Sequence, residues 1–424
     1  MTARSFLFLQ GPQSLFFERV ARRLMSRGNA VHRINLNLGD RLFWRLPATD
    51  FRGRFDDWPA FIGDLLTTRG VTDLVLLGDR RPYHAAAIAA AQQRGVGVFV
   101  TDLGYVRPGW LTLELDGNTS RSRFPRTPDA IRALAEEFPE PDFARRFHTP
   151  FWRLAAHDIA YNTAAVAGRT IYPHYRRHGL YHPFAEYASW IANAPRRTAE
   201  RRATAAARAA FAAQPGSYFL FPLQLATDFQ MRAESPFASA VEALQAVLAS
   251  FAASDTSRQL LVIGHPLDEG LTDWRGLIRH SGLGKRATFL GGGIPDALLA
   301  GAAGVVTVNS TTGLSALRLG VPVKPLGNAI YDIPGLTHLG NLADFWRAPQ
   351  PPDPALTRAF LRALVGATQV AGGYYGGAAQ AAAAPVFAER LDRGVYKLPA
   401  RSVLSCAATP FAAEEEWPGI PHSI

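Results

Sequence analysis

The stretch GVVTVNSTTGLSALRLGVPVKPLGNAIYD, residues Gly304–Asp332, decides the fold of this chain. Its first part, Gly304–Val308, is a β-branched run typical of a buried strand. Leucines at helical spacing then indicate a short helix, which Gly320 ends before a second strand over Val321–Leu326. A strand, a polar turn, a helix and a strand make a βαβ unit, which predicts a parallel sheet.

The turn inside this unit joins the first strand to the helix and is rich in hydroxyl groups. Its residues are Asn309, Ser310, Thr311, Thr312 and Gly313. The unpaired N–H groups and the dipole of a helix N-terminus favour an anion, so the turn is a candidate phosphate site. An ordinary helix cap is the alternative, because Ser and Thr are common N-cap residues.

The composition indicates a globular protein long enough for two domains. The chain has 424 residues, of which 48% are hydrophobic and 11% aromatic. Its one cysteine, Cys406, excludes an internal disulfide, and no Cys/His spacing suggests a zinc site, which fits a reducing compartment. The first apolar run is too short for a signal peptide, and no segment is apolar for long enough to span a membrane. We therefore expect a cytoplasmic protein.

The chain is basic, with a formal net charge of +10 that comes mainly from arginine. A positive surface attracts acidic sugars, nucleotides, anionic lipid headgroups or nucleic acid. No zinc-finger, RRM or helix-turn-helix signature supports specific binding to nucleic acid. A compositional bias toward Arg and Ala is the alternative explanation of the charge.

Strands and helices alternate at the start of the chain. Strands are predicted over 5–10, 31–36, 73–77 and 96–101, with helices between them. This alternation is typical of a doubly wound, mostly parallel sheet, in which ligands bind at the carboxyl ends of the strands. Turns are commonly polar and Gly-rich, so a polar strand end alone is weak evidence of a ligand site. The candidate ligand-binding residues at or shortly after these ends are Gly11, Gln13, Asn37, Asp79, Arg80, Tyr105 and Arg107.

Glu114 stands between Leu113 and Leu115 in an apolar, alternating run. A carboxyl group in apolar surroundings has a raised pKa and suits acid–base chemistry. The alternative is a strand glutamate that points to solvent. Residues 127–213, which follow soon after, are predicted to be helical and to connect the two halves of the chain closely.

A second α/β sheet is predicted from Gly216 onward. Strands are expected over 217–223, 259–263 and 287–290, before the βαβ unit of Gly304–Asp332. His265 and Pro266 follow one of these strands. The Gly/Ala-rich stretch 368–387 is expected to be a flexible loop, and the tail beyond Pro399 shows no clear element.

Two Rossmann-like domains that lack the G-x-G-x-x-G dinucleotide fingerprint favour a GT-B-like architecture, with two domains facing across a cleft. The predicted domains are 1–213, with a helical insertion, for the acceptor and 214–370 for the nucleotide sugar. Residues 371–424 form a tail that is expected to pack back on the first domain. The strand-end residues of the first half then become candidate acceptor-binding residues.

Seven motifs in order resemble the KpsS/KpsC type of capsule polysaccharide proteins, which include β-Kdo transferases, and the KpsS-like branch matches better. The resemblance covers most of the chain, from about Phe6 to Trp346. The motifs are FLQGPQSLFF at Phe8–Phe17, INLNLGD at Ile34–Asp40, GDRRPYH at Gly78–His84, GYVRPGWLTLELDGN at Gly104–Asn118, PLQLATDFQ at Pro222–Gln230, GHPLD at Gly264–Asp268, and the long run Val308–Thr337.

The resemblance implies transfer of Kdo (3-deoxy-D-manno-oct-2-ulosonic acid) from CMP-Kdo with retention, by double displacement. It implies that Asp228 is the nucleophile, that Glu114 is the acid/base, and that His265 donates to the CMP phosphate or the departing oxygen. Pro266, Asn309, Ser310, Thr311, Thr312, Gly313 and Lys324 are the other implied nucleotide-binding residues. Arg80, Arg107 and Arg126 are candidates for an anionic acceptor.

The resemblance further implies neither a metal nor a separate cofactor. The implied partners are CMP-Kdo, an anionic glycolipid built on lysophosphatidylglycerol, the inner-membrane surface and other capsule biosynthesis proteins, but not nucleic acid. Two alternatives stay open. One is a non-catalytic capsule export or assembly component on the same scaffold. The other is a GT-B enzyme with a different donor, such as CMP-sialic acid or a UDP-sugar.

Overall fold

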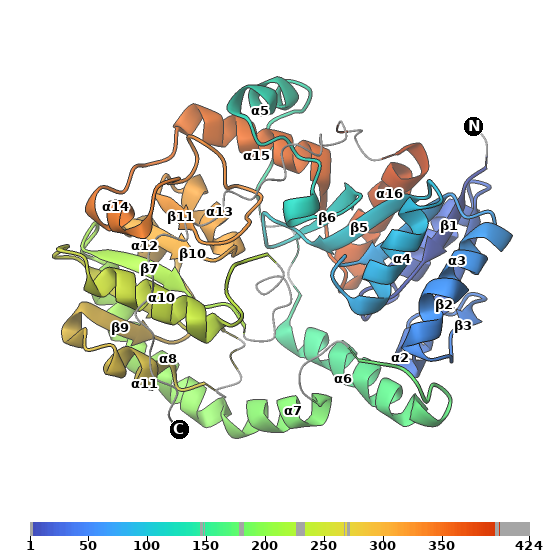
Figure 1. Cartoon of the computed structure of the whole chain (residues 1–424), viewed down its shortest axis with the longest axis horizontal. Coiled ribbons are helices and arrows are strands. Elements are labelled where there is room, and N and C mark those ends of the chain that lie inside the picture. The colour runs from blue at the N-terminus through green and yellow to red at the C-terminus, as the bar shows by residue number, and fades with distance from the viewer. Residues whose placement is uncertain are drawn as a thin grey trace.

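Apolar residues on both sides of the first strand place it inside a sheet that helices cover on both faces. Phe6 and Phe8 belong to one core cluster, and Leu7 and Leu9 belong to another, as the two-residue period of a strand requires. The computed structural model describes residues 3–144, 147, 149–177, 182–225, 234–266, 268, 272–394 and 398. It contains two such sheets, which lie on opposite sides of the molecule (Figure 1).

The first sheet has seven strands in the order β12-β6-β5-β4-β1-β2-β3. Strands β1 to β5 run parallel, whereas β6 is antiparallel to both of its neighbours. The strands are β1 (Ser5–Phe8), β2 (Ala30–Asn35), β3 (Thr49–Asp50), β4 (Asp73–Leu77), β5 (Gly97–Leu103), β6 (Trp110–Leu115) and β12 (Gln369–Ala371). The helices of this part are α1 (Phe16–Met25), α2 (Leu38–Leu42), α3 (Trp58–Thr68), α4 (Pro82–Gln92) and α16 (Gly377–Arg393). Helix α5 (Pro128–Ala135) packs instead on α15 (Pro354–Thr368), in the core of the second sheet.

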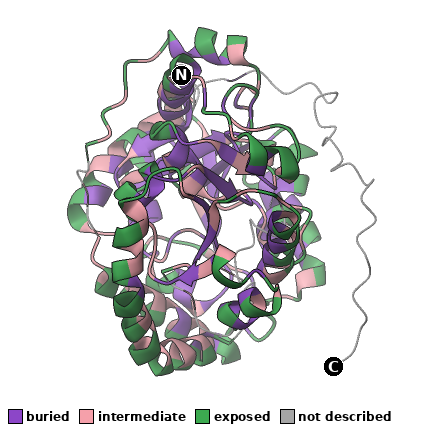
Figure 2. Cartoon of the chain, turned by 90° about the vertical axis from the view of Figure 1, so that its left-hand side faces the viewer, coloured by how far each residue is buried: buried purple, intermediate pink, exposed green. Residues whose placement is uncertain are grey.

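The second sheet has five parallel strands in the order β11-β10-β7-β8-β9. The strands are β7 (Tyr218–Pro222), β8 (Gln259–Ile263), β9 (Ala287–Leu290), β10 (Gly304–Thr307) and β11 (Val323–Pro325). Its helices are α10 (Ala240–Ala252), α11 (Trp274–His280), α12 (Asp296–Ala300), α13 (Thr311–Arg318), α14 (Leu342–Arg347) and α15 (Pro354–Thr368). Figure 2 shows the strands as buried and the outer faces of the helices as exposed.

Both sheets use the same strand order, counted along the chain within each part. In the first sheet β1 pairs with β2 on one side and with β4 on the other, so the chain crosses back over β1 after β3. In the second sheet β7 pairs with β8 on one side and with β10 on the other in the same way. This is the doubly wound Rossmann order, whose ligands bind at the switch point between the two halves of the sheet. The predicted α/β, GT-B-like class with two Rossmann-like parts is confirmed. The domain limits at residues 213 and 370 remain a prediction.

Three helices connect the two parts along one side of the molecule (Figure 1). They are α6 (Phe151–Ala167), α7 (Pro183–Ala192) and α8 (Ala194–Ala212), as the prediction of a helical connection requires. Four short 3-10 turns complete the described elements: η1 (Phe55–Asp57), η2 (Thr119–Arg121), η3 (Gly168–Thr170) and η4 (Gly284–Arg286). Among the described helices, none combines the length and the apolar character needed to cross a bilayer.

The prediction that residues 368–387 form a flexible loop is wrong. Gln369–Ala371 pairs with β6 as strand β12, and Gly377–Arg393 is the helix α16, which packs against α1. Between them Tyr374 is buried, and its hydroxyl donates to the Asp102 carbonyl at 2.8 Å. The chain therefore returns from the second sheet to complete the first.

Candidate functional site

The switch point of the second sheet carries a paired amide cluster. Gln224 follows β7, and Asn309 follows β10, the neighbouring strand. The Gln224 Nε2 group donates to Asn309 Oδ1 at 2.8 Å, and the Asn309 N–H donates back to Gln224 Oε1 at 3.3 Å. These two bonds hold the Asn309 turn at the carboxyl edge, where a doubly wound sheet binds its ligand.

Helix α13 begins directly after this pair, and Ser310 is its N-cap. The Ser310 Oγ atom accepts from the Thr312 N–H at 3.2 Å, and the Gly313 N–H donates to the Ser310 carbonyl at 3.0 Å. The sequence predicted unpaired N–H groups in this turn. The N–H groups of Thr312 and Gly313 are instead bonded within the turn. The Tyr331 hydroxyl donates to the same Ser310 carbonyl at 2.6 Å. A Cβ at Gly313 would lie 2.3 Å from that hydroxyl oxygen, so this position requires glycine.

The turn therefore combines a rigid backbone with half-buried hydroxyl groups on Ser310, Thr311 and Thr312. An anion at this helix N-terminus would bind through these hydroxyls and through the helix dipole. Lys324, on β11, is less available than predicted, because its Nζ group donates to the His338 carbonyl at 3.3 Å. Burial lowers the pKa of Lys324, and the nearby Asp332 carboxylate opposes that shift.

His265 and Pro266 line an open, shallow cavity beside the carboxyl ends of β8 and β9. Helix α8 forms the opposite wall, and the Arg201 guanidinium donates to the Pro266 carbonyl at 2.9 Å. Basic residues outnumber acidic ones in its lining, although Glu200 and Asp268 also line it. Its arginines are Arg196, Arg197, Arg201 and Arg275. From the sequence, the three arginines of α8 were predicted only to lie in a connecting helix, because their approach to His265 is a tertiary contact.

The carboxyl edges of the two sheets meet at a second cluster. Arg80, shortly after β4, forms an ion pair with Glu234, which lies in the segment between β7 and α10. Glu234 is buried, and its backbone carbonyl accepts from the Asn328 N–H at 2.7 Å. Arg126 makes a further contact between the parts by donating to the Ala329 carbonyl at 2.6 Å. Glu234 was missed by the sequence analysis, because nothing local marks it as the partner of Arg80.

Asp79 lies beside this ion pair and is completely buried. Among the described residues, neither of its carboxylate oxygens has a hydrogen-bond partner. Arg80 and Arg121 approach them, each at 3.9 Å. Burial raises the pKa of Asp79, and the two guanidinium groups reduce that rise. A buried carboxyl group without hydrogen bonds is unusual in a protein interior, and it marks this cluster as a candidate ligand site.

Glu114 is buried in the same region, so the alternative of a solvent-facing glutamate is wrong. The Tyr105 hydroxyl donates to Glu114 Oε1 at 2.7 Å, and the Ser122 hydroxyl donates to Oε2. Burial raises the pKa of Glu114 to about 7, although both hydrogen bonds and the charge of Arg126 favour its ionised form. A carboxyl group with a pKa near neutrality can both accept and return a proton.

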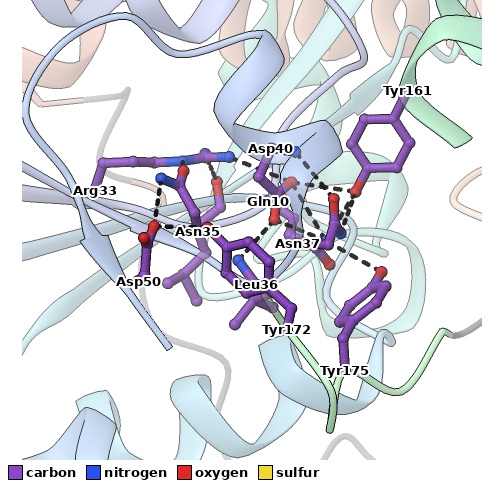
Figure 3. Close-up of polar contacts among 11 residues, drawn as sticks. Gln10, Arg33, Asn35, Leu36, Asn37, Asp40, Asp50, Tyr161, Tyr172 and Tyr175 are labelled. Atoms are coloured by element: carbon purple, nitrogen blue, oxygen red, sulfur yellow. Dashed lines mark hydrogen bonds and ion pairs between the residues drawn. The ribbon is translucent and has the colours of Figure 1, made fainter. Parts of the chain in front are cut away.

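Asn37, the predicted acceptor residue after β2, contacts Tyr161 of the connecting helix α6 (Figure 3). Asn37 caps α2 and donates to the Tyr161 hydroxyl at 2.9 Å. Gln10 donates to the same hydroxyl at 2.9 Å, and Tyr161 donates to Asp40 Oδ1 at 3.1 Å. Asn37 therefore has a structural role in this network, and its role in acceptor binding stays a prediction.

The other predicted acceptor residues also have partners within the fold. Gln13 donates to Asp158 Oδ1 at 2.9 Å, and Gly11 packs against the ring of Phe17, where a Cβ would lie 2.3 Å from the nearest ring atom. Arg107 donates to the Gly104 carbonyl at 3.1 Å. The structure thus brings Asp79, Arg80, Tyr105 and Glu114 together. It places Gln13 and Asn37 against α6, and Gly11 against Phe17 of α1.

Asp228, the predicted nucleophile, lies outside the described residues. The described residues that flank this segment are Leu225, shortly after β7, and Glu234, the ion-pair partner of Arg80. Within the described chain, no three His, Cys, Asp or Glu side chains are close enough to hold a metal ion together.

Comparisons with known proteins identify relatives over most of the chain. A family model described as capsule polysaccharide biosynthesis protein matches residues 72–375. The capsule polysaccharide modification protein LipB of Neisseria meningitidis serogroup A is 33% identical over 391 residues, which cover 88% of this chain and 92% of LipB. The capsule polysaccharide export protein KpsS of Escherichia coli is 31% identical over 382 residues, which cover 88% of this chain and 98% of KpsS. Among solved structures, the β-Kdo 2,7 transferase KpsC of Thermosulfurimonas dismutans matches 92% of this chain and 99% of its own, with 13% identity and a TM-score of 0.44.

Proposed function

The chain belongs to the capsule polysaccharide biosynthesis protein family, and on that premise we propose that it is a retaining β-Kdo glycosyltransferase. The donor is CMP-Kdo, and the acceptor is a lysophosphatidylglycerol-linked glycolipid of the capsule linker. LipB is named for capsule modification and KpsS for capsule export, so both relatives place the family in capsule assembly.

The observation that carries the proposal is the Glu114 carboxyl group. It is buried where the two sheets approach each other, and burial raises its pKa to about 7. Glycosyl transfer to a hydroxyl group needs a base that accepts the hydroxyl proton as the new bond forms. A carboxyl group with a pKa near neutrality suits this role better than an exposed one.

Retention follows from two successive inversions at the anomeric carbon of Kdo. In the first, a carboxylate oxygen of Asp228 attacks that carbon, and the bond to the CMP phosphate oxygen breaks, so that CMP leaves with the bonding electrons. In the second, an acceptor hydroxyl attacks the same carbon, its proton passes to Glu114, and the bond to Asp228 breaks. Asp228 is thereby released as a free carboxylate, and Glu114 returns its proton to solvent before the next turnover.

The donor side of the proposal uses the carboxyl edge of the second sheet. The Ser310–Gly313 turn binds the CMP phosphate through its hydroxyls and the dipole of α13, with Asn309 oriented by Gln224. His265, which lines the basic cavity, donates a proton or a hydrogen bond to the departing phosphate. CMP leaves as an anion, and the arginines around that cavity favour an anionic leaving group.

The test is release of CMP from CMP-Kdo by the purified full chain in the presence of the lipid acceptor. Asp228→Asn is expected to abolish transfer and to leave CMP binding intact. The matched control is Asp273→Asn, because Asp273 only caps α11 by accepting from the Gly276 N–H at 2.9 Å. Near-normal turnover by Asp228→Asn would contradict the nucleophile assignment.

Two further outcomes separate the alternatives. A parent chain that binds CMP but never releases it from CMP-Kdo would be an assembly component rather than an enzyme. Thermal shifts with CMP, UMP and UDP test the donor, since the proposal expects stabilisation by CMP above the others. A preference for UDP would exclude CMP-Kdo.

A further inference from the structure

The Arg126 guanidinium joins backbone from the two parts of the chain. Its Nη1 group donates to the Ala329 carbonyl at 2.6 Å, and its Nη2 group donates to the Thr119 carbonyl at 2.8 Å. Thr119 starts the η2 turn after β6, whereas Ala329 follows β11 of the second sheet. Arginine suits such a connection, because its planar fork donates in several fixed directions at once. We call these two hydrogen bonds the Arg126 bridge.

Thr119 has a strained backbone conformation at one end of the Arg126 bridge. Its φ is 53°, and a β-branched residue in this left-handed region is an outlier. Strain of this kind persists only where surrounding contacts hold it. The Thr119 carbonyl accepts from Arg126 and from the Ser122 N–H at 3.3 Å, and the Thr119 N–H donates to the Tyr105 hydroxyl at 2.9 Å. The bridge therefore helps to hold Thr119 in this conformation.

The Thr119 N–H determines the direction of the Tyr105 hydroxyl. Because the hydroxyl oxygen accepts from this backbone N–H, its own proton is left for Glu114 Oε1, which lies 2.7 Å away. Ser122 is held in the same way, since its Oγ atom accepts from the Phe124 N–H at 3.1 Å and donates to Glu114 Oε2. Backbone N–H groups thus orient both hydroxyls that hold the Glu114 carboxylate.

The other end of the Arg126 bridge is connected to the candidate phosphate turn. Tyr331 lies two residues after Ala329, and its hydroxyl donates to the Ser310 carbonyl at 2.6 Å. Ala329 and Tyr331 are buried in the same apolar cluster as Phe124, which follows η2. Closely packed residues transmit a displacement instead of absorbing it. Hydrogen bonds and packing therefore connect the turn at Ser310 to Glu114 through Arg126.

We propose that Arg126 is a positioning residue that holds the Tyr105–Glu114 pair in register with the donor-binding turn. Glu114 lies on the first sheet and the turn on the second, so contacts between the two parts must set their relative position. In this role Arg126 touches no reacting atom and acts through the backbone of Thr119. The inference rests on the proposed function, because Glu114 is the proposed base.

The charge of Arg126 acts on the same carboxyl group. Burial has the largest effect and raises the pKa of Glu114, and the Asp79 carboxylate, after β4, adds to that rise. The hydrogen bonds from Ser122 and Tyr105 and the positive charge of Arg126 oppose the rise, because they favour the ionised form. Removing the Arg126 charge should therefore raise the pKa of Glu114 further.

Other charged residues lie near these groups. Arg123 lines the hollow beside Glu114 and forms an ion pair with Asp116. Burial raises the pKa of Asp332, and the charge of Arg126 opposes that shift as well. A test of the link between Arg126 and Glu114 must therefore separate Glu114 from Asp332.

The test compares Arg126→Met and Arg126→Lys with the parent in transferase assays. Methionine removes both donors and the charge, whereas lysine keeps the charge but lacks the planar fork. Both variants should lower kcat by about 10–100-fold with little change in either KM, because the reacting groups are misplaced but still bound. Urea unfolding gives the folded fraction, so kcat is expressed per folded chain. If Arg126→Met does not fold, Arg126→Lys decides by the same readout.

Arg286→Met is the matched control. Arg286 is half-buried like Arg126, and its Nη2 group donates to the Ser254 carbonyl at 2.8 Å and to the Phe251 carbonyl at 3.4 Å. It directly precedes β9, at the amino end of the sheet and away from the carboxyl edge that carries the site. This variant should lose stability and keep the parental kcat and KM.

The pH dependence of stability isolates Glu114. The free energy of unfolding of a Glu114→Gln variant minus that of its own background shows, as pH is varied, where Glu114 titrates. Asp332 is present in both members of each comparison, so its titration cancels. The titration should move to higher pH in the Arg126→Met background and stay near the parental pH in the Arg126→Lys background, which keeps the charge. An unchanged titration in Arg126→Met would overturn the proposal.

The Arg126 bridge can also be measured without activity. Arg126→Met and Tyr105→Phe remove partners on opposite sides of Thr119, so their effects on the free energy of unfolding should not add. Non-additive effects in a parent that releases no CMP would reject the proposed function alone. Additive effects in an active parent would reject the positioning role alone.

Two kinetic outcomes would overturn the proposal as well. A parental kcat in Arg126→Lys would show that charge suffices and that the bridge is not needed. A rise in the KM for the acceptor with an unchanged kcat would make Arg126 a ligand of the acceptor instead of a positioning residue.

Discussion

Replacing Glu114 by glutamine removes a titratable group from the interior and keeps its shape. Glu114 is 4% exposed, and Tyr105 and Ser122 donate hydrogen bonds to its carboxylate. Burial raises the pKa of Glu114 from 4.5 to about 7. At about 1.36 kcal/mol per pKa unit, this rise corresponds to about 3 kcal/mol of destabilisation of the ionised form.

The sign of the pH dependence follows from which state holds the proton more tightly. The folded chain has the higher pKa, so below pH 4.5 both states are protonated and the carboxyl group costs no stability. Between pH 4.5 and about 7 the unfolded chain loses its proton first, so the stability of the parent falls as pH rises. A glutamine side chain does not titrate, so the Glu114→Gln variant escapes this loss.

The assay is urea unfolding of the parent and the Glu114→Gln variant at two pH values. The difference in free energy of unfolding, variant minus parent, should increase by about 2.5 kcal/mol between about pH 5 and about pH 8. Transferase activity should fall by roughly 10²–10⁴-fold, because the variant lacks the proposed base. At high pH the variant would then gain stability relative to the parent and yet have lower transferase activity. A residue that serves function at the expense of stability is expected to show this combination.

Thr112→Val is the matched control for this experiment. Thr112 is buried on the same strand and carries no titratable group, so its effect on stability should not depend on pH. If the free energy of unfolding of Glu114→Gln minus that of the parent is the same at both pH values, Glu114 does not titrate between about pH 5 and about pH 8. Full transferase activity in the same variant would refute its role as the base.

Two other substitutions test the contacts around the site. Arg80→Gln leaves Glu234 buried without its ion-pair partner and should lower the free energy of unfolding by about 3 kcal/mol. Adding Glu234→Gln should recover part of that loss, as measured by urea unfolding. If the changes in free energy of unfolding of the two single variants simply add in the double variant, the pairing is contradicted. Ser310→Ala should cost about 1 kcal/mol of stability through the lost N-cap and weaken CMP binding measured by calorimetry. Ser239→Ala removes the equivalent cap of α10 and should cost similar stability without changing CMP affinity, so equal affinities of all three chains would reject the phosphate turn.

The strands and most helices could be predicted because their signals are local. A strand covered on both faces needs apolar side chains at nearly every position, and β1 and β4 show this pattern over a few residues. The turn from Asn309 to Gly313 was visible for the same reason, since Ser310 lies at the start of a helix in the sequence as well as in space. The Rossmann-like class follows from the alternation of such local elements.

The run Gly372–Gly377 shows the limit of this reasoning. Glycine-rich sequence locally favours a flexible loop, which was the prediction. Its order comes from β12, which pairs with β6, and from the Tyr374 hydroxyl, which bonds to the Asp102 carbonyl, 272 positions away. Contacts at such separation leave no trace in a short window of sequence.

The amino-acid sequence by itself determined the α/β class, the capped turn after β10 and the residue types that glycosyl transfer requires. Only the tertiary structure decided their chemical state. Glu114 has a pKa near neutrality because strands and loops from distant parts of the chain exclude water from it. Arg80 faces Glu234, 154 positions away, because the carboxyl edges of two separate sheets meet there. Burial and charge pairing depend on the whole fold, whereas helix and strand formation depends mainly on neighbouring residues.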